Sequence, residues 1–187
     1  MLLALAASGC SALDAEQPVA LAPEGEWTGR QIETLRQAAR CWNLQFGTSL
    51  EVAPDVAWPQ EVRLRFTDLV CVYAVARTSP SLPVRVDICP TRFFFSAASG
   101  NREPFLFATL LHELGHVLNI RRHAEGSLAI MASGEEKRDL SQIVPPGFAD
   151  EDRRLFYDAN PGFALDAPCA QVVVDRSLSP PVCACAR

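Results

Sequence analysis

The sequence has no long apolar run and no block of basic residues. No stretch approaches the roughly 18 consecutive apolar residues that a membrane-spanning helix needs, which excludes an integral membrane protein of that kind. The 17 Lys and Arg are outnumbered by 22 Asp and Glu, and the resulting net charge of −5 argues against a nucleic-acid partner. With 49% apolar and 21% charged residues, the 187-residue chain is typical of one folded domain.

Histidine is also scarce, and its three copies are not scattered. His112, His116 and His123 fall within a stretch of twelve residues. We expect the first two to lie on a helix that begins near Pro104 and continues through apolar residues to Ile120. Residues four apart on a helix differ by about 40° and about 6 Å, so both imidazoles can reach one ion.

The rest of this predicted helix supports a metal-binding face. Four apolar side chains are expected on the side away from the histidines: Phe107, Leu111, Leu114 and Leu118. Two histidines satisfied inside a core helix without a metal are the alternative. The H-E-x-x-H spacing within an apolar helix favours the metal.

The residue types suit zinc chemistry. Two imidazoles and a third ligand hold Zn²⁺ and leave one position for a water, whose pKa the ion lowers to about 7. Glu113 follows the first ligand directly. We therefore expect Glu113 to be the general base that takes the proton of the zinc-bound water and passes it to the leaving amine.

The segment HELGHVLNIRRH, residues 112–123, resembles the metzincin motif H-E-x-x-H-x-x-G-x-x-H. In that family the chain turns at the glycine and brings a third histidine to the metal. Asn119 stands at the glycine position, and asparagine tolerates a left-handed turn better than other side chains. His123 comes one residue later than in the motif, so the extra residue needs a wider loop. The resemblance implies that His123 is the third ligand.

Two downstream segments extend the resemblance. Met131 lies eight residues after His123, similar to the methionine turn of matrixin-like members, which forms an apolar floor under the histidines. Residues 149–157 resemble the closing helix of the family. The resemblance covers residues 27–162 and is specific over 112–131. It implies an α+β, metzincin-like zincin with a twisted mixed sheet, a backing helix, an active-site helix and a small C-terminal subdomain.

A different third ligand stays open. Residues 135–139, EEKRD, resemble the E-x-x-x-D of thermolysin-like enzymes, in which a glutamate about twenty residues beyond the second histidine completes the site. Glu135 or Glu136 would then replace His123. Charge runs of this kind are usually solvated surface, which favours His123.

Several further elements are readable from the pattern. A helix is expected over 28–46, capped by Thr28 and ended near Gly47. A strand is expected over 61–67, two more over 69–76 and 84–88, and a short helix over 149–158 with acidic residues in its first turn. The segment 84–88 is our candidate for an exposed sheet edge to which a peptide substrate could add as a strand.

The N-terminal residues indicate export. Residues 1–9 form a short signal-like segment, and Ala7 to Cys10 resemble a bacterial lipobox, in which the cysteine carries a lipid. An incidental Cys10 in a frayed terminus is the alternative. Residues 10–26 have no sustained periodicity and are interpreted as a tether. We expect a zinc peptidase domain over 27–165 and a disulfide-stapled tail over 166–187.

The other six cysteines agree with an oxidising compartment. Three disulfides among them are the natural interpretation, with buried free thiols as the alternative. Cys71 and Cys89 lie in neighbouring strand-like segments and form a plausible pair. Cys183 and Cys185 are too close to bridge each other, so each should bond elsewhere and hold the tail to the body. No C-x2-C pair is present, so a cysteine zinc site is not favoured.

Together these patterns predict a monomeric zinc-dependent endopeptidase that cleaves extracytoplasmic proteins or peptides. It would be secreted or anchored to a bacterial membrane by a lipid on Cys10. The alternative is a zinc-binding but catalytically inactive interaction module on a zincin fold. The presence of Glu113 argues against an inactive module, because a structural zinc site does not require a general base.

Overall fold

The structure of the chain is a computed structural model. It describes residues 13–53, 58–70, 76–79, 84–90, 102–125, 129–132 and 144–186. None of the helices in these ranges is both long and apolar enough to cross a membrane. The elements in chain order are β1 (Val19–Glu24), α1 (Gly29–Phe46), β2 (Leu50–Val52), β3 (Gln60–Phe66), the 3-10 helix η1 (Asp68–Val70), β4 (Ala76–Ser79), β5 (Val84–Ile88), α3 (Arg102–Val117), α4 (Asp150–Ala159), β6 (Val172–Asp175) and β7 (Val182–Cys185).

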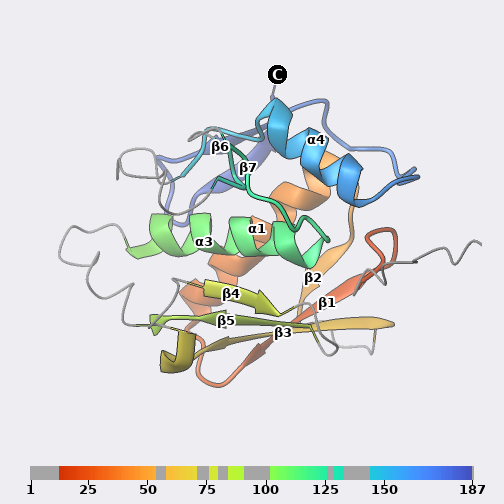
Figure 1. Cartoon of the computed structure of the whole chain (residues 1–187). Coiled ribbons are helices and arrows are strands. Elements are labelled where there is room, and N and C mark those ends of the chain that lie inside the picture. Colours follow the sequence, from red (N-terminus) through yellow and green to blue (C-terminus); the bar gives the residue numbers. More distant parts are fainter. Residues whose placement is uncertain are drawn as a thin grey trace, which may run out of the picture.

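One mixed sheet of five strands forms the base of the molecule. Its order is β2-β1-β3-β5-β4, and β4 pairs antiparallel to β5 while the other pairs are parallel. The helices α1 and α3 lie over one face of this sheet, and α3 lies between the sheet and the C-terminal elements (Figure 1). The fold is therefore a mixed α/β arrangement, and the predicted mixed sheet is confirmed.

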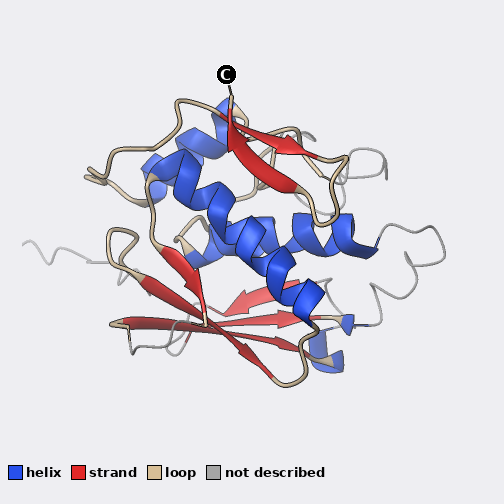
Figure 2. Cartoon of the chain, turned by 180° about the vertical axis from the view of Figure 1, so that it is seen from behind, coloured by secondary structure: helices blue, strands red, loops and turns tan. Residues whose placement is uncertain are grey.

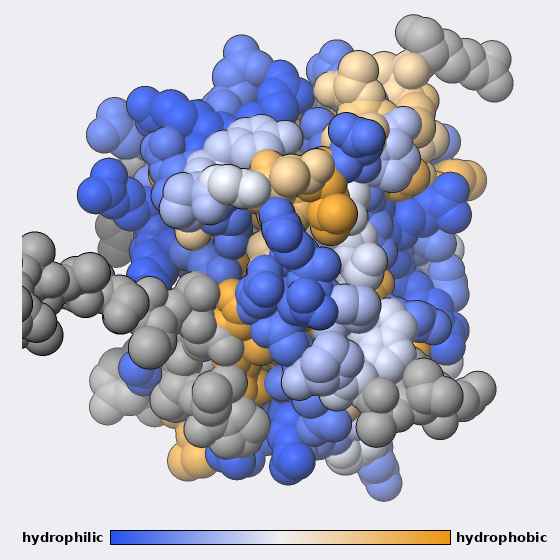
Figure 3. Space-filling model, turned by 90° about the vertical axis from the view of Figure 1, so that its right-hand side faces the viewer, coloured by the Kyte–Doolittle hydropathy of each residue, from blue (hydrophilic) through white to orange (hydrophobic). Residues whose placement is uncertain are grey.

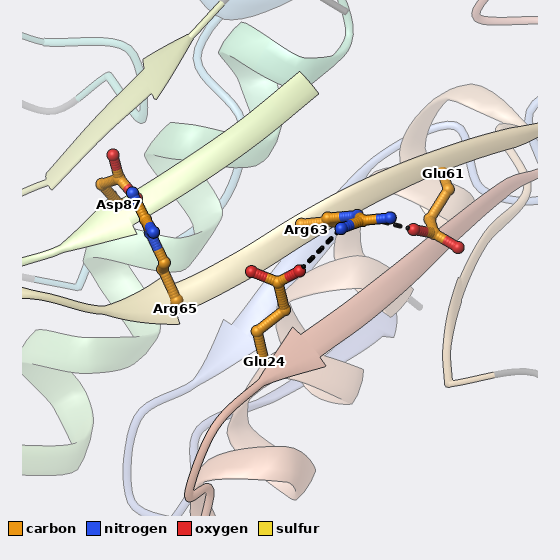
Figure 4. Close-up of polar contacts among 5 residues, drawn as sticks. All are labelled: Glu24, Glu61, Arg63, Arg65 and Asp87. Atoms are coloured by element: carbon orange, nitrogen blue, oxygen red, sulfur yellow. Dashed lines mark hydrogen bonds and ion pairs between the residues drawn. The ribbon is translucent and has the colours of Figure 1, made fainter. Parts of the chain in front are cut away.

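Buried and exposed side chains alternate along β3, so one face of the sheet is apolar and the other is charged. Val62 and Leu64 are fully buried beneath the helices, as the predicted strand requires. The opposite face carries charged side chains instead. Its ion pairs join Arg63 to Glu24 and Glu61, and Arg65 to Asp87 (Figure 4). Exposed pairs of this kind contribute only about 0–1 kcal/mol each, so burial under the helices dominates.

Helix α1 is the helix predicted over residues 28–46, and its ends match the sequence pattern. Thr28 caps it by accepting the N–H of Gln31, whose side chain in turn accepts the N–H of Thr28. The helix ends at Gly47, where φ is 75°. A Cβ there would lie 2.6 Å from the carbonyl oxygen of Asp166, so glycine is needed for space as well. Figure 2 shows α1 crossing the molecule diagonally.

The prediction of a tether over residues 10–26 is wrong for residues 19–24. Residues 19–24 form β1, which pairs with β2 on one side and β3 on the other. Val19 and Leu21 are buried in the core. Apolar and polar residues do not alternate in this segment because β1 is a short strand inside the sheet. Pro23 lies beyond the last residue of β1 that pairs with β2, so its missing N–H costs no hydrogen bond to that strand.

The predicted strand over 69–76 is also wrong where the structure describes it. Asp68–Val70 is a 3-10 helix, residues 71–75 lie outside the described ranges, and β4 begins only at Ala76. The segment 84–88 is a strand as predicted. However, it lies between β3 and β4, so it is not the exposed edge. That edge belongs to β4.

The C-terminal elements pack against α1 around aromatic side chains. Trp42 and Phe46 of α1 contact Phe148, and Phe46 stacks on Phe156 of α4 with ring centroids 4.0 Å apart. The antiparallel strands β6 and β7 lie beside α1. This packing holds α4 over the same core that supports α3.

Two disulfides secure the tail, as the cysteine pattern predicts in outline. Cys183 bonds to Cys41 in α1, and Cys185 bonds to Cys169. The first ties the tail to the body, whereas the second closes a loop within the tail. Cys89 is disulfide-bonded too. Its expected partner, Cys71, lies outside the described residues, so that pairing stays a prediction.

Polar residues cover most of one face of the molecule, with smaller apolar areas among them (Figure 3). Large apolar side chains that are exposed in the described residues are Leu69, Tyr157, Leu165, Val173 and Leu178. They come from separate segments of the chain, and scattered exposure of this kind is ordinary for a folded protein.

Candidate metal centre

Helix α3 presents two of the histidines and then stops abruptly. It runs over Arg102–Val117, close to the predicted span. Asn119 has a φ of 70°, the left-handed conformation that the sequence indicated. The N–H of Ile120 bonds to the carbonyl of Gly115, and that of Asn119 to His116, which together form a Schellman end. The chain therefore reverses within three residues of His116.

This reversal brings the three histidines together. The ring centroid of His112 lies 4.8 Å from that of His116 and 5.2 Å from that of His123. One ligand nitrogen from each residue lies within 4.8 Å of the others. His112 and His116 are half-buried and His123 is exposed. The site thus opens toward solvent on the side of His123.

Backbone carbonyls orient the first two imidazoles. Nδ1 of His112 lies 2.8 Å from the carbonyl oxygen of Ile130, and Nδ1 of His116 lies 2.5 Å from that of Ile120. A carbonyl can only accept, so each Nδ1 carries the proton and each Nε2 keeps its lone pair. Burial also lowers the pKa of His116. Burial thus favours the neutral imidazole that a metal binds, while the hydrogen bond to the Ile120 carbonyl acts in the opposite direction on the pKa.

The donor set fits zinc. Three neutral imidazoles with an open fourth position are a donor set of catalytic zinc sites. Nitrogens around a tetrahedral zinc are about 3.4 Å apart when the Zn–N bonds are about 2.1 Å. The observed spread is somewhat wider, and small rotations of the rings would close it. The exposed position of the His123 ring allows such a rotation.

The extra residue before His123 is accommodated in an exposed loop. Arg121 and Arg122 are both exposed, so the additional length adds no strain to the core. The loop is then fixed again at Ala124, whose N–H donates to the carbonyl of Met131 at 2.8 Å. Glu135 and Glu136, the alternative ligands, lie outside the described residues, as does Cys10.

Met131 lies beneath the helix that carries the histidines. Its side chain is fully buried. A Cβ on Gly115 would lie 2.3 Å from its sulfur and 3.0 Å from the Trp42 ring, so glycine at position 115 leaves the space into which the Met131 side chain packs. The sequence predicted Met131 as an apolar floor. It did not predict the part played by Gly115, although that residue stands between the two histidines.

A buried carboxylate holds the Met131 segment, residues 129–132. Asp152, in the first turn of α4, is fully buried. Its oxygens accept the N–H groups of Ile130, Met131 and Ala149 at 3.0, 2.9 and 2.9 Å. The sequence placed Asp152 in the first turn for its effect on the helix dipole, but its long-range partners need the tertiary structure.

Glu113 is buried beside the histidines, with its carboxylate directed to β4. Its side chain is 6% exposed, and Oε2 accepts the hydroxyl of Thr78 at 2.6 Å. Burial raises the pKa of Glu113 to about 7, while the hydroxyl and N–H of Thr78 and the charge of His123 act in the opposite direction. Thr78 was missed by sequence reasoning, because nothing near it in the sequence indicates a contact 35 residues away.

No protein-family model and no curated protein matches the chain. Among solved structures, it is similar to archaemetzincin from Methanopyrus kandleri, with a TM-score of 0.49 and 10% sequence identity. The match covers 78% of this chain and 96% of the archaeal chain.

Proposed function

We propose that this chain is a zinc-dependent endopeptidase. His112, His116 and His123 would hold the ion, and Glu113 would be the general base. The observation that carries the proposal is the gathering of three imidazoles beside a buried carboxylate from the same helix. A purely structural zinc site does not need that carboxylate, and burying it is costly.

Each residue has a distinct part in the reaction. A zinc ion bound here would supply an activated water and polarise the substrate carbonyl. Glu113 takes the proton of the attacking water and delivers it to the leaving amine. Ile130 and Ile120 keep Nε2 of the first two histidines directed at the site through their carbonyls. Met131, which is fully buried, would form the apolar floor beneath the helix.

We propose that an extended peptide substrate binds along β4. In the described sheet β4 is an outer strand, and it contacts α3. A peptide that added to β4 would use main-chain hydrogen bonds, which suits many sequences. Thr78 of β4 touches Glu113. The peptide would therefore lie beside the general base, so β4 replaces residues 84–88 as our candidate substrate strand.

The proposed location is outside the cytoplasm. The two described disulfides are typical of an oxidising compartment. A lipid on Cys10 remains part of the proposal. Leu13 is buried, and its carbonyl accepts the side-chain amide of Asn119 at 2.8 Å. A lipid on Cys10 would thus hold the zinc-site end of α3 close to the membrane. We propose a monomer that acts on protein or peptide substrates.

The test is cleavage of unfolded casein by the zinc-loaded protein. We expect cleavage that stops on chelation, returns with zinc and is absent in Glu113→Gln. The matched control is Glu51→Gln, which changes an exposed glutamate on β2 and should cleave as the wild type does. Cleavage that survives both chelation and Glu113→Gln would refute the mechanism. A zinc-loaded wild type that cleaves no member of a peptide library would favour the inactive binding module.

A further inference from the structure

We propose that Thr78 is a positioning residue that fixes the Glu113 carboxylate and joins it to the substrate strand. The inference deepens the proposed peptidase function and rests on it. It assigns a specific task to a residue that lies far from the histidines in the sequence and comes from the sheet rather than from α3.

The contact itself is short and sheltered. The Thr78 hydroxyl donates to Oε2 of Glu113 at 2.6 Å, and the carboxylate is almost completely buried. Thr78 is half-buried, with its side chain on the face of β4 that α3 covers. Bulk water therefore has little access to take the place of the hydroxyl. A hydrogen bond to a buried charged group is stronger than one at the surface.

The bond distinguishes the two oxygens of the carboxylate. Rotation about the terminal torsion of a glutamate is soft and nearly two-fold. The hydroxyl bound to Oε2, together with the N–H of Thr78, restricts that rotation, and we infer that Oε1 accepts the proton of the attacking water. Glu113 later returns that proton from Oε1 to the leaving amine. Thr78 keeps its own proton throughout, so it takes no part in the transfer itself.

The position of Thr78 on β4 gives the contact its second role. Thr78 pairs with Val86 of β5, which fixes β4 against the rigid centre of the sheet. The other edge of β4 is the one proposed to bind the peptide. One strand would thus set the position of both the scissile carbonyl and the base. Reactions are sensitive to such relative placement, because a misplacement of about 1 Å can cost about 100-fold in rate.

The experiment compares Thr78→Val, which keeps the shape and removes the hydroxyl, with Thr78→Ser, which keeps the hydroxyl. Thr34→Val is the matched control, because Thr34 is a buried threonine whose hydroxyl bonds to the carbonyl of Arg30 at 2.8 Å, in α1. In Thr78→Val we expect kcat to fall about 10- to 100-fold, with KM and zinc content unchanged. Thr78→Ser should recover most of kcat, and Thr34→Val should keep it.

Crystal structures of the zinc-loaded wild type and Thr78→Val supply a readout that does not depend on cleavage. The Glu113 carboxylate should be turned or spread over several orientations in Thr78→Val. An unchanged kcat in Thr78→Val would overturn the inference while leaving the peptidase function standing. If the wild type cleaves nothing, the proposed peptidase function fails. The inference about Thr78 is then decided by the two crystal structures alone. A Glu113 carboxylate that stays in place without the hydroxyl then overturns the inference.

Discussion

Asp152 and Met131 are joined by a hydrogen bond of 2.9 Å between a fully buried carboxylate and a backbone N–H. The same carboxylate accepts a hydrogen bond from the N–H of Ile130. The carbonyl of Ile130 in turn accepts a hydrogen bond from Nδ1–H of His112. The carbonyl of Met131 accepts the N–H of Ala124, the neighbour of His123. The Asp152 carboxylate in α4 thus fixes the segment that orients His112 and that bonds to the backbone next to His123.

We expect Asp152→Asn to weaken both the fold and zinc binding. The amide replaces one accepting oxygen with a donor that faces N–H groups, so at least one of the three bonds is lost and a buried N–H is left unpaired. The free energy of unfolding should fall by about 2–4 kcal/mol, measured by urea denaturation. Zinc affinity, measured by competition with a chelator, should fall about 10- to 100-fold.

The control for that substitution is Asp150→Asn in the same turn. Its side chain is 96% exposed, so both quantities should stay close to the wild-type values. If Asp152→Asn unfolds more easily but binds zinc with unchanged affinity, Asp152 supports only the fold and the proposed relay to His112 is wrong.

We expect Gly115→Ala to disturb the packing of Met131 and Trp42 against α3. The new methyl group would lie 2.3 Å from the sulfur of Met131. The flexible methionine can move, but the Trp42 ring closes the other side, so we expect a loss of about 1–3 kcal/mol in the free energy of unfolding. A cycle with Met131→Ala alone and the double variant tests the cause, because Gly115→Ala should cost less stability once the methionine is absent. Thermal denaturation of the wild type and the three variants measures the effect.

Gly29→Ala is the matched control for that substitution. It lies in the first turn of α1, where a Cβ would meet nothing within 4 Å. Alanine there should leave stability unchanged or raise it by up to about 1 kcal/mol. If the two glycine substitutions destabilise the protein equally, the close approach of Met131 is not the reason for glycine at position 115.

The parts of this molecule that sequence could predict are those whose signal is local. The cap at Thr28, the end at Gly47, the left-handed Asn119 and the strands at 61–67 and 84–88 depend on neighbours within a few residues. The spacing of His112 and His116 is likewise a property of one helix. These predictions were correct because local backbone preference and tertiary packing favour the same conformation there.

What sequence could not predict depends on pairings between distant segments. An interior strand of six residues need not alternate, and the partners of β1 lie 31 and 41 residues ahead, so its sequence does not distinguish it from a tether. Strand order cannot be read from the strands themselves, so the sequence does not show that residues 84–88 lie inside the sheet. The contacts of Thr78 and Asp152 are hidden for the same reason, since each acts on a residue more than twenty positions away.

Asn119 provides a test of the turn that returns the chain to His123. Asn119→Gly keeps the left-handed conformation but loses the amide bonds to Leu13 and Asn160. Asn119→Ala loses the same bonds and must also adopt a positive φ. The alanine variant should therefore be less stable than the glycine variant by about 1 kcal/mol in urea denaturation. Equal stabilities would mean that the turn is not held at that conformation in solution.

The raised pKa of Glu113 predicts a pH dependence in the metal-free protein. The ordinary value is 4.5 and the folded value is about 7, so the folded state holds this proton more tightly than the unfolded state. The associated stability is fully present below pH 4.5 and is lost as the pH rises to about 7, a change of about 3 kcal/mol. Glu113→Gln cannot lose a proton and should not show this change.

The measurement is urea denaturation of both proteins with a chelator from pH 4.5 to pH 8. Relative to wild type, Glu113→Gln should gain stability steadily up to about pH 7 and then level off. His116, whose pKa is lowered by burial, gives the opposite slope at acid pH, but it is present in both proteins and cancels in the difference. A difference that stays constant across the range would show that Glu113 titrates normally. Its carboxylate would then be better solvated than the buried contact with Thr78 implies.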